Sequence, residues 1–193
     1  MHELTPDAVL PLLRGQLGRS YRYVESCTST QRLLGGAEPE GAVAVAEHQT
    51  DGRGRLGRAW EDRPRRAILM SVLLRPAPPL PHWPELSVIA GEAVARALRA
   101  ETGLDASVRH PNDVVVAGRK LAGVLPEAAN GRVVLGIGVN VNQTPEELPR
   151  GTATPATSVR VETGRSIERA PLLAAILWEL ERGYGAWAAA YDR

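Results

Sequence analysis

The stretch that decides the fold is residues 107–141, with the sequence SVRHPNDVVVAGRKLAGVLPEAANGRVVLGIGVNV. Its apolar, β-branched runs are typical of strands, and they lie at 107–109, 114–116, 121–125 and 133–141. Only two short turns, Ala117-Gly118-Arg119 and Asn130-Gly131, separate the last three runs. Because such tight turns join antiparallel neighbours, this stretch predicts an antiparallel sheet.

Further elements are predicted on both sides of this stretch. Short apolar runs predict three more strands, at 21–24, 42–46 and 68–74. Helix-like periodicity predicts long helices at 84–103 and 168–190, and start signals predict shorter ones after residues 5 and 28. Residues 144–157 are expected to be a loop rich in Pro, Thr and Gly. We predict an α/β (α+β) fold over residues 1–193 as a single domain, with a mixed, largely antiparallel sheet backed by helices.

The composition excludes several classes of protein. The formal net charge of the 193 residues is +1, so no global field attracts nucleic acid. Cys27 is the only cysteine, which rules out an intramolecular disulfide and fits a reducing compartment. No apolar run approaches the ~20 residues of a membrane span, and the N-terminus does not look like a signal peptide. We therefore expect a cytoplasmic protein that binds neither DNA nor membranes.

Lysine is almost absent from the chain. Of 23 basic residues only Lys120 is a lysine, and the rest are arginine. An arginine offers a planar fork, whereas a lysine offers a compact ammonium on a thin stem. Composition alone leaves two explanations open: the lysine survived by chance, or a site requires the compact cation.

The most unusual segment is Gly52-Arg53-Gly54-Arg55-Leu56-Gly57-Arg58-Ala59-Trp60. Although it spells G-x-G-x-x-G, residues 47–51 separate it from the preceding strand and no helical periodicity follows, which disfavours a dinucleotide fold. Glycines let backbone N–H groups approach an anion, and the arginines supply charge. We expect a mobile lid that orders over a phosphate ester or acyl phosphate, with Trp60 as an aromatic platform. A solvated basic turn or a nucleic-acid arm are the alternatives.

A second group of residues surrounds Lys120. The residues Pro111-Asn112-Asp113 are typical of a turn, and a plain turn with a solvated carboxylate is the simplest interpretation. If both flanking segments are strands, Lys120 returns towards Asp113, and Gly123 leaves room for a ligand. Asn140 is a polar residue in an apolar run. For the hydroxyls of Thr28-Ser29-Thr30, N-capping is the better interpretation in isolation.

Taken together, the motifs resemble the catalytic domain of biotin–protein ligases. In order they are a Ser-Thr pair, Gly-Arg-Gly-Arg-x-Gly-Arg-x-Trp, Pro-Asn-Asp, Gly-Arg-Lys-Leu-Ala-Gly and Gly-Ile-Gly-x-Asn, and they cover residues 25–142. The resemblance implies a sheet related to class II aminoacyl-tRNA synthetases and lipoate ligases. It also implies an ATP-dependent ligase that forms biotinyl-5′-AMP. Biotin would then pass to a lysine of the biotin carboxyl carrier protein of acetyl-CoA carboxylase.

The resemblance also implies the roles of individual residues. Lys120 and Arg55 would be catalytic. The biotin-binding residues would be Ser29, Thr30, Gln31, Gln49, Thr50, Gly54, Arg55, Leu56, Lys120 and Gly123. The ATP-binding residues would be Arg53, Arg58, Trp60, Asn112 and Asn140, with Asp113 helping to place Mg²⁺ or the acceptor lysine.

Other expectations concern domains, partners and alternative functions. The chain ends at Arg193, just after the last predicted helix, so we expect neither the family's C-terminal β-barrel nor an N-terminal helix-turn-helix domain. The family usually has Lys-Trp where Arg109-His110 stands here. A homodimer through a sheet edge is possible by analogy. The alternatives are a lipoate or octanoate ligase of the same fold, or a non-catalytic biotin-binding paralogue.

Overall fold

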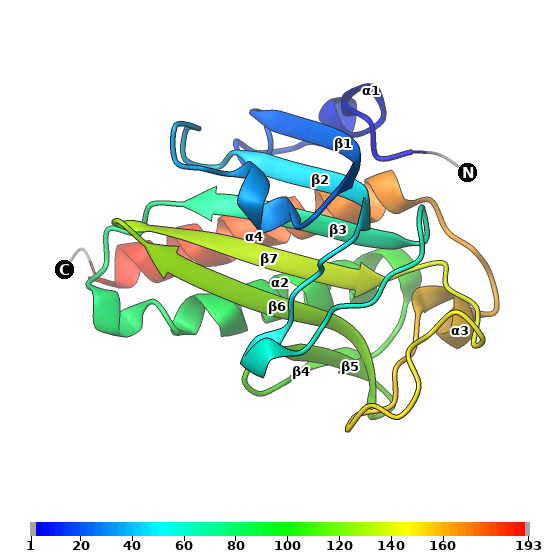
Figure 1. Ribbon diagram of the computed structural model, residues 1–193. Coiled ribbons are helices and arrows are strands. Elements are labelled where there is room, and N and C mark those ends of the chain that lie inside the picture. Colours follow the sequence, from blue (N-terminus) through cyan, green and yellow to red (C-terminus); the bar gives the residue numbers. More distant parts are fainter. Residues whose placement is uncertain (1–2, 192–193) are drawn as a thin grey trace.

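The computed structural model describes residues 3–191 and contains a seven-stranded sheet (Figure 1). Its strands are β1 (Tyr21–Cys27), β2 (Val43–Gln49), β3 (Ala67–Leu74), β4 (Ala106–Arg109), β5 (Asp113–Val116), β6 (Arg119–Ala129) and β7 (Arg132–Asn140). They lie in the order β1-β2-β3-β7-β6-β5-β4. Only the β1–β2 pair is parallel, and all the others are antiparallel. The predicted mixed, largely antiparallel sheet is confirmed.

The two long helices cover one face of this sheet, and two 3₁₀ turns lie over the other (Figure 1). The helices are α1 (Pro6–Val9), α2 (Glu85–Thr102), α3 (Val159–Thr163) and α4 (Arg169–Tyr191). The 3₁₀ turns are η1 (Leu10–Leu12), η2 (Thr30–Leu33), η3 (Arg55–Gly57) and η4 (Leu80–His82). Figure 1 shows α2 and α4 behind the sheet, with η2 and η3 in front of it. The front face is therefore left to loops, which can shape a binding site.

The main core fills the layer between the sheet and the two long helices. Leu86 and Leu98 of α2 and Leu172 and Leu180 of α4 are fully buried there. Each such leucine contributes roughly 1.5–3 kcal/mol relative to an exposed one. Gly103 ends α2 in the left-handed conformation, at φ 72°, as the sequence predicts. Within residues 3–191, no helix is both long and apolar enough to cross a bilayer.

Two helix predictions need correction. The N-terminal helix is shorter than expected: α1 passes into η1 at Leu10, and the backbone is extended at Leu13, where η1 ends. Pro11 accounts for this change because it has no N–H to continue an α-helix. Helix α3 was not predicted, because its five residues are too few to show a period. The signal present was Ser158, whose Oγ accepts the Val161 N–H as an N-cap.

A β-bulge decides which way Lys120 faces. Val114 pairs with Ala122 but Val115 pairs with Lys120, so Leu121 is the extra residue of β6. Leu121 and Ala122 are both fully buried in the core. The bulge thereby puts Lys120 on the open front face instead of beneath the helices.

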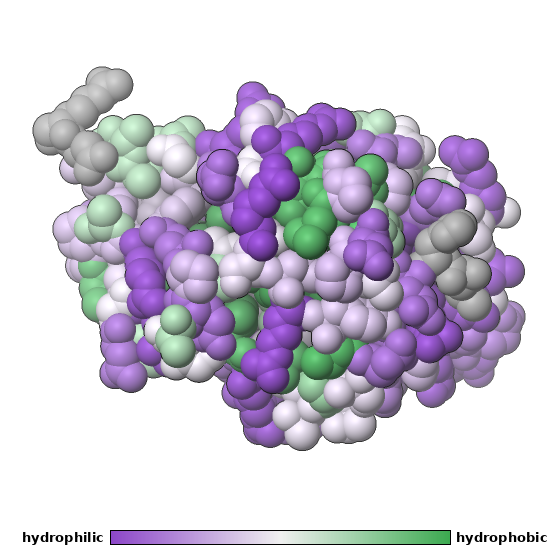
Figure 2. All heavy atoms as spheres, turned by 90° about the horizontal axis from the view of Figure 1, so that it is seen from above, coloured by the Kyte–Doolittle hydropathy of each residue, from purple (hydrophilic) through white to green (hydrophobic). Residues whose placement is uncertain are grey.

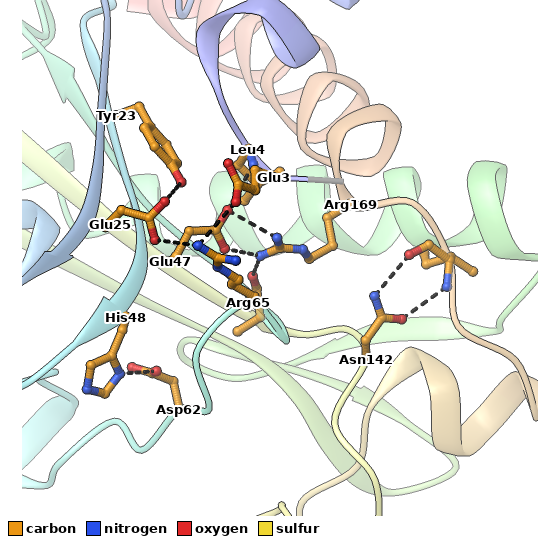
Figure 3. A network of polar contacts seen from close by, with 12 residues as sticks. Glu3, Leu4, Tyr23, Glu25, Glu47, His48, Asp62, Arg65, Asn142 and Arg169 are labelled. Atoms are coloured by element: carbon orange, nitrogen blue, oxygen red, sulfur yellow. Dashed lines mark hydrogen bonds and ion pairs between the residues drawn. The ribbon is translucent and has the colours of Figure 1, made fainter. Parts of the chain in front are cut away.

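A buried ion pair joins α4 to β2. Nη1 of Arg169 lies 2.6 Å from Oε2 of Glu47, and the two side chains are only 2% and 1% exposed. Arg169 also donates to the carbonyl of Ala67 at 2.8 Å, and Glu47 accepts the Leu4 N–H at 2.9 Å (Figure 3). The pair therefore fixes the N-terminal segment, the start of α4 and two strands together. The local sequence pattern did not predict this ion pair.

The upper face of the molecule, at the β1 edge, is divided between polar and apolar residues. Figure 2 shows hydrophobic residues there in patches separated by hydrophilic ones. The edge strand β1 exposes the charged residues Arg22 and Glu25. Charged side chains on an edge strand discourage pairing with another chain. The homodimer expected by analogy stays a prediction.

Candidate active site

A cavity of about 600 Å³ opens on the sheet face opposite α2 and α4. Its walls are the segment 29–31, the Gly-Arg segment 52–60 (here the flap), the turn 110–113, parts of β6 and β7, and the segment 149–156. Small-molecule sites generally have volumes of this order. The cavity therefore brings together motifs that lie far apart in the sequence.

Nearly all of the predicted site residues line this cavity. They are Ser29, Thr30, Gln31, Gln49, Arg53, Gly54, Arg55, Leu56, Arg58, Trp60, Asn112, Asp113, Lys120, Gly123 and Asn140. Thr50 is the exception, and its expected place in the site is corrected. Thr50 is exposed beyond the end of β2, and both its N–H and its hydroxyl donate to the carbonyl of Cys27. These bonds turn it towards β1 and away from the cavity.

Lys120 lies in the cavity wall, paired with a carboxylate. Its Nζ is 2.6 Å from Oδ1 of Asp113, and the two side chains are 29% and 23% exposed. The same Nζ lies 5.7 Å from the centre of the Trp60 ring. The predicted return of Lys120 towards Asp113 is confirmed. Because the pair remains open to the cavity, the ammonium can also reach an anionic ligand.

The flap is a narrow hairpin with an exposed tip. Trp60 N–H donates to the carbonyl of Gly52 at 2.8 Å, and Gly54 N–H donates to that of Arg58 at 2.7 Å. A Cβ on Gly52 would lie 2.4 Å from the Trp60 carbonyl oxygen, so the neck requires glycine there. Leu56 at the tip is 84% exposed and has a φ of 58°.

The three flap arginines have different partners. Arg53 makes two contacts of 2.9 Å with the Glu127 carboxylate on β6. Arg55 donates to Oδ1 of Asn112 at 3.2 Å. Arg58 makes neither an ion pair nor a side-chain hydrogen bond within the described chain. Arg53 therefore anchors the flap, whereas Arg58 is the guanidinium left for a ligand.

Trp60 packs against glycines of two strands. A Cβ on Gly138 would lie 2.5 Å from its ring, and one on Gly123 would lie 3.0 Å from it. The room expected beside Gly123 for a ligand is thus occupied by the indole and by the Lys120 stem. The indole Nε1 is buried and has no partner among residues 3–191.

The floor of the cavity is a polar cluster at the start of η2. Thr30 donates from its N–H and its hydroxyl to Oε1 of Gln49, at 2.8 and 3.1 Å. Gln31 donates to the carbonyls of Leu125 and Val134, which fixes η2 on β6 and β7. Ser29 precedes η2, but its side chain makes no capping bond, so the N-capping interpretation is wrong. The Ser29 hydroxyl and the Gln49 amide nitrogen are left for a ligand.

A buried carboxylate holds the stem of the flap. The Asp62 side chain is 0% exposed, lies 2.7 Å from His48 Nδ1 and accepts the Gln49 N–H at 3.0 Å (Figure 3). Asp62 follows the flap and Gln49 precedes it. The contact therefore brings the two ends of the flap together and orients Gln49.

The two asparagines predicted to bind ATP use their amides within the protein. Asn112 donates to the Val124 carbonyl at 2.9 Å, and Asn140 donates to that of Thr157 at 3.0 Å. Asn140 also accepts a bond from Gln143. Both residues border the cavity, and their role in ATP binding stays a prediction.

Sequence reasoning missed the outer wall, formed by residues 149–156. This segment runs beside Lys120, whose N–H donates to Pro155 at 2.7 Å. Arg109 donates to the hydroxyl of Thr154 at 3.0 Å. The abundance of threonine and glycine in 144–157 was the available signal, but only the fold places that loop against β6.

The acidic residues of the cavity do not form a metal cage. Within residues 3–191 there is no group of three or more His, Cys, Asp or Glu side chains that could hold a metal ion. Asp113 is engaged by Lys120, and the other lining carboxylate belongs to Glu61. Since Mg²⁺ prefers carboxylates together with substrate phosphates, this donor set does not fit a magnesium ion held by the protein alone.

The single thiol is not suited to covalent catalysis. Burial, with a further contribution from the Asp62 carboxylate, raises the pKa of Cys27 above its usual range. The thiol is therefore neutral at pH 7, and only a thiolate is a good nucleophile. The cavity thus offers cations and polar groups to a ligand.

Residues 23–143 match the sequence model of the Biotin/lipoate A/B protein ligase family. The chain belongs to this family. The crystallised biotin protein ligase from Aquifex aeolicus, in complex with biotin and ATP, superposes with a TM-score of 0.80 at 31% identity. That match covers 89% of this chain and 72% of the other. The superposition shows that this chain has the same fold as that ligase.

Curated relatives extend the comparison. The bifunctional ligase/repressor BirA of Bacillus subtilis is 36% identical over 177 residues, which is 87% of this chain and 54% of that protein. The biotin–[acetyl-CoA-carboxylase] ligase of Mycobacterium tuberculosis is 46% identical over 125 residues, covering 61% of this chain and 46% of the relative. The chain thus spans about half the length of these curated relatives.

Proposed function

We propose that this chain is a biotin–protein ligase. It would form biotinyl-5′-AMP from biotin and ATP and transfer biotin to a lysine of the carboxyl carrier protein of acetyl-CoA carboxylase. The observation that carries the proposal is the meeting of Lys120, Arg55 and Arg58 at one cavity with a polar floor. Relatives named as biotin ligases, and a related structure holding biotin and ATP, support it.

The first step brings two anions together. An oxygen of the biotin carboxylate attacks the α-phosphorus of ATP and forms a new O–P bond, and pyrophosphate leaves with the electron pair of the broken P–O bond. Because negative charge builds up where the two ligands meet, cations fixed at that point stabilise the transition state. Lys120 lines the cavity beside Trp60 of the flap and would serve the carboxylate and the α-phosphate together. Arg55 and Arg58 would close over the phosphates.

The polar floor of the cavity would decide which carboxylic acid binds as substrate. The ureido head of biotin has both N–H donors and a carbonyl acceptor, which match the free Ser29 hydroxyl and the Gln49 amide. Leu125 and Trp60 add apolar wall for the rest of the ligand. A site that hydrogen-bonds such a group discriminates strongly against analogues without it, because its polar groups would stay unpaired. Lipoate and octanoate have no ureido group.

The second step is acyl transfer. The acceptor amine attacks the acyl carbon, a C–N bond forms, the bond from that carbon to the phosphate oxygen breaks, and AMP leaves as the amine loses a proton. Water would hydrolyse the same intermediate, so the closed flap must exclude it. Mg²⁺, which neutralises phosphate charge, would be held mainly by the nucleotide. Asp113 would act chiefly on Lys120.

The test is pyrophosphate release by the purified chain with ATP and each of three acids: biotin, lipoate and octanoate. We expect release with biotin only. Release with lipoate or octanoate instead would assign the chain to the lipoate branch. Calorimetric binding of biotin without pyrophosphate release would identify a non-catalytic paralogue, and no response to biotin would refute the proposal.

A further inference from the structure

We propose that Glu162 of α3 is a positioning residue for Lys120, acting through a clamp that joins β6 to the segment 149–157. The inference rests on the proposed function, because it concerns the cation of that site. Glu162 is not among the residues that line the cavity. Its effect would pass through Arg119 and Thr157.

The clamp begins at the main chain of Lys120. Lys120 N–H donates to the Pro155 carbonyl at 2.7 Å, and its own carbonyl accepts the Thr157 N–H at 2.8 Å. The segment 155–157 therefore pairs with β6 at Lys120, as a parallel bridge to Ala156. The position of Lys120 depends on whether this short segment stays in place.

Glu162 holds both sides of that pairing. One carboxylate oxygen lies 2.7 Å from Nη2 of Arg119, the residue before Lys120. The other accepts the hydroxyl of Thr157, the residue bonded to the Lys120 carbonyl. The Glu162 side chain is only 8% exposed, whereas that of Arg119 is 43% exposed, so water reaches the ion pair only from the arginine side. Charge-assisted bonds of this kind are stronger and more directional than neutral ones.

The helix that carries Glu162 is itself anchored. Ser158 caps α3 and donates from its hydroxyl to the Gln143 carbonyl at 2.7 Å. Arg160 N–H bonds the Val141 carbonyl at 2.8 Å, just beyond β7. Glu162 therefore reaches Lys120 from a fixed point on the sheet, although α3 is only five residues long.

Lys120 needs such support because its stem is flexible and its ammonium must meet a small target. Asp113 fixes the ammonium end at 2.6 Å, and the clamp fixes the backbone end. A displacement of about 1 Å at a reacting group can cost roughly 100-fold in rate. The clamp should therefore affect the chemical step far more than binding of biotin.

The test is Glu162→Gln, assayed by biotin-dependent pyrophosphate release. Glutamine has the same shape and can still accept the Thr157 hydroxyl, but it turns an amide N–H₂ towards Arg119 and removes the charged bond. We expect kcat to fall by roughly 10- to 100-fold, with the KM for biotin within about twofold. Glu179→Gln is the matched control: Glu179 also pairs with an arginine, at 3.1 Å, but on α4. It should behave like the wild type.

A second readout does not depend on activity. Because the chain has a single lysine, lysine labelled with ¹³C only at Cε gives one side-chain carbon NMR signal, which reports on Lys120 alone. In the ligand-free protein, Glu162→Gln and Thr157→Val should both shift this signal, and Glu179→Gln should not. Thr157→Val removes the hydroxyl side of the clamp and leaves the Arg119 side.

These outcomes separate the clamp from the function. A folded Glu162→Gln variant with wild-type kcat and an unshifted lysine signal would overturn the clamp while the wild type still releases pyrophosphate. A variant whose kcat loss only matched its loss of folded protein would show a merely structural role and would also overturn it. A wild type without pyrophosphate release would instead refute the proposed function, and the lysine signal would still test the clamp.

Discussion

The molecule contains two cation–carboxylate pairs with the same separation of 2.6 Å and different surroundings. Glu47 and Arg169 are almost fully enclosed, and each makes a further hydrogen bond, from the Leu4 N–H and to the Ala67 carbonyl respectively. Asp113 and Lys120 are about a quarter exposed and border the cavity. The comparison shows that surroundings, more than pairing, decide what a charge can do: the enclosed pair stabilises, and the open one can bind.

The largest effect should come from breaking the enclosed pair. Arg169→Met leaves the Glu47 carboxylate buried and unpaired, which should lower the free energy of unfolding by about 3–5 kcal/mol. Urea unfolding measures the loss, and pyrophosphate release per folded molecule should be unchanged. A loss below about 1 kcal/mol would remove the distinction between the two pairs.

Breaking the open pair should affect chemistry instead. Lys120→Ala should slow adenylation by roughly 10²–10³-fold, because one charge-stabilising group is lost from the transition state. Single-turnover pyrophosphate release measures this, with urea unfolding as the check on stability. Lys120→Arg should also be impaired, because the planar fork does not fit where the compact ammonium lies between Asp113 and Trp60. Full activity in Lys120→Arg would contradict this use of the lone lysine.

The flap should show a third, intermediate effect. Arg55→Gly removes the contact from the flap to Asn112 and should leave adenylate formation in place while the intermediate escapes. Chromatography of the free adenylate, with no acceptor protein present, measures the escape. Arg53→Gly is the informative companion, because it removes the anchor to Glu127 instead. Adenylate retained by Arg55→Gly as well as by the wild type would rule out a lid role for Arg55.

The smallest effect should come from an exposed pair on α4. Arg182 lies 3.1 Å from Glu179, and its side chain is 58% exposed. Such pairs contribute little, so Arg182→Ala should change the free energy of unfolding by less than about 0.5 kcal/mol. The same urea titration measures it. A loss approaching that of Arg169→Met would show that exposure does not decide the value of a pair in this protein.

Much of the fold could be predicted from local signals. The turns at Gly118 and Asn130-Gly131 set the antiparallel order of β5, β6 and β7 because turn chemistry acts over a few residues. Gly103 ended α2 for the same kind of reason. The site residues were found as motifs, and nearly all of them line one cavity. Thr50 was misplaced because only its bonds to Cys27 decide which way it turns.

The sequence by itself determined the strands, the long helices, the lone ammonium and the cationic flap, since each depends on residues that are close together in the sequence. Only the tertiary structure decided how these parts are used. It set the bulge at Leu121 that turns Lys120 to the open face, the division of labour among the three flap arginines, and the burial of Glu47 with Arg169. The contacts of the arginines and of Glu47 depend on partners tens of residues away, and a charge takes its role from the groups that surround it after folding.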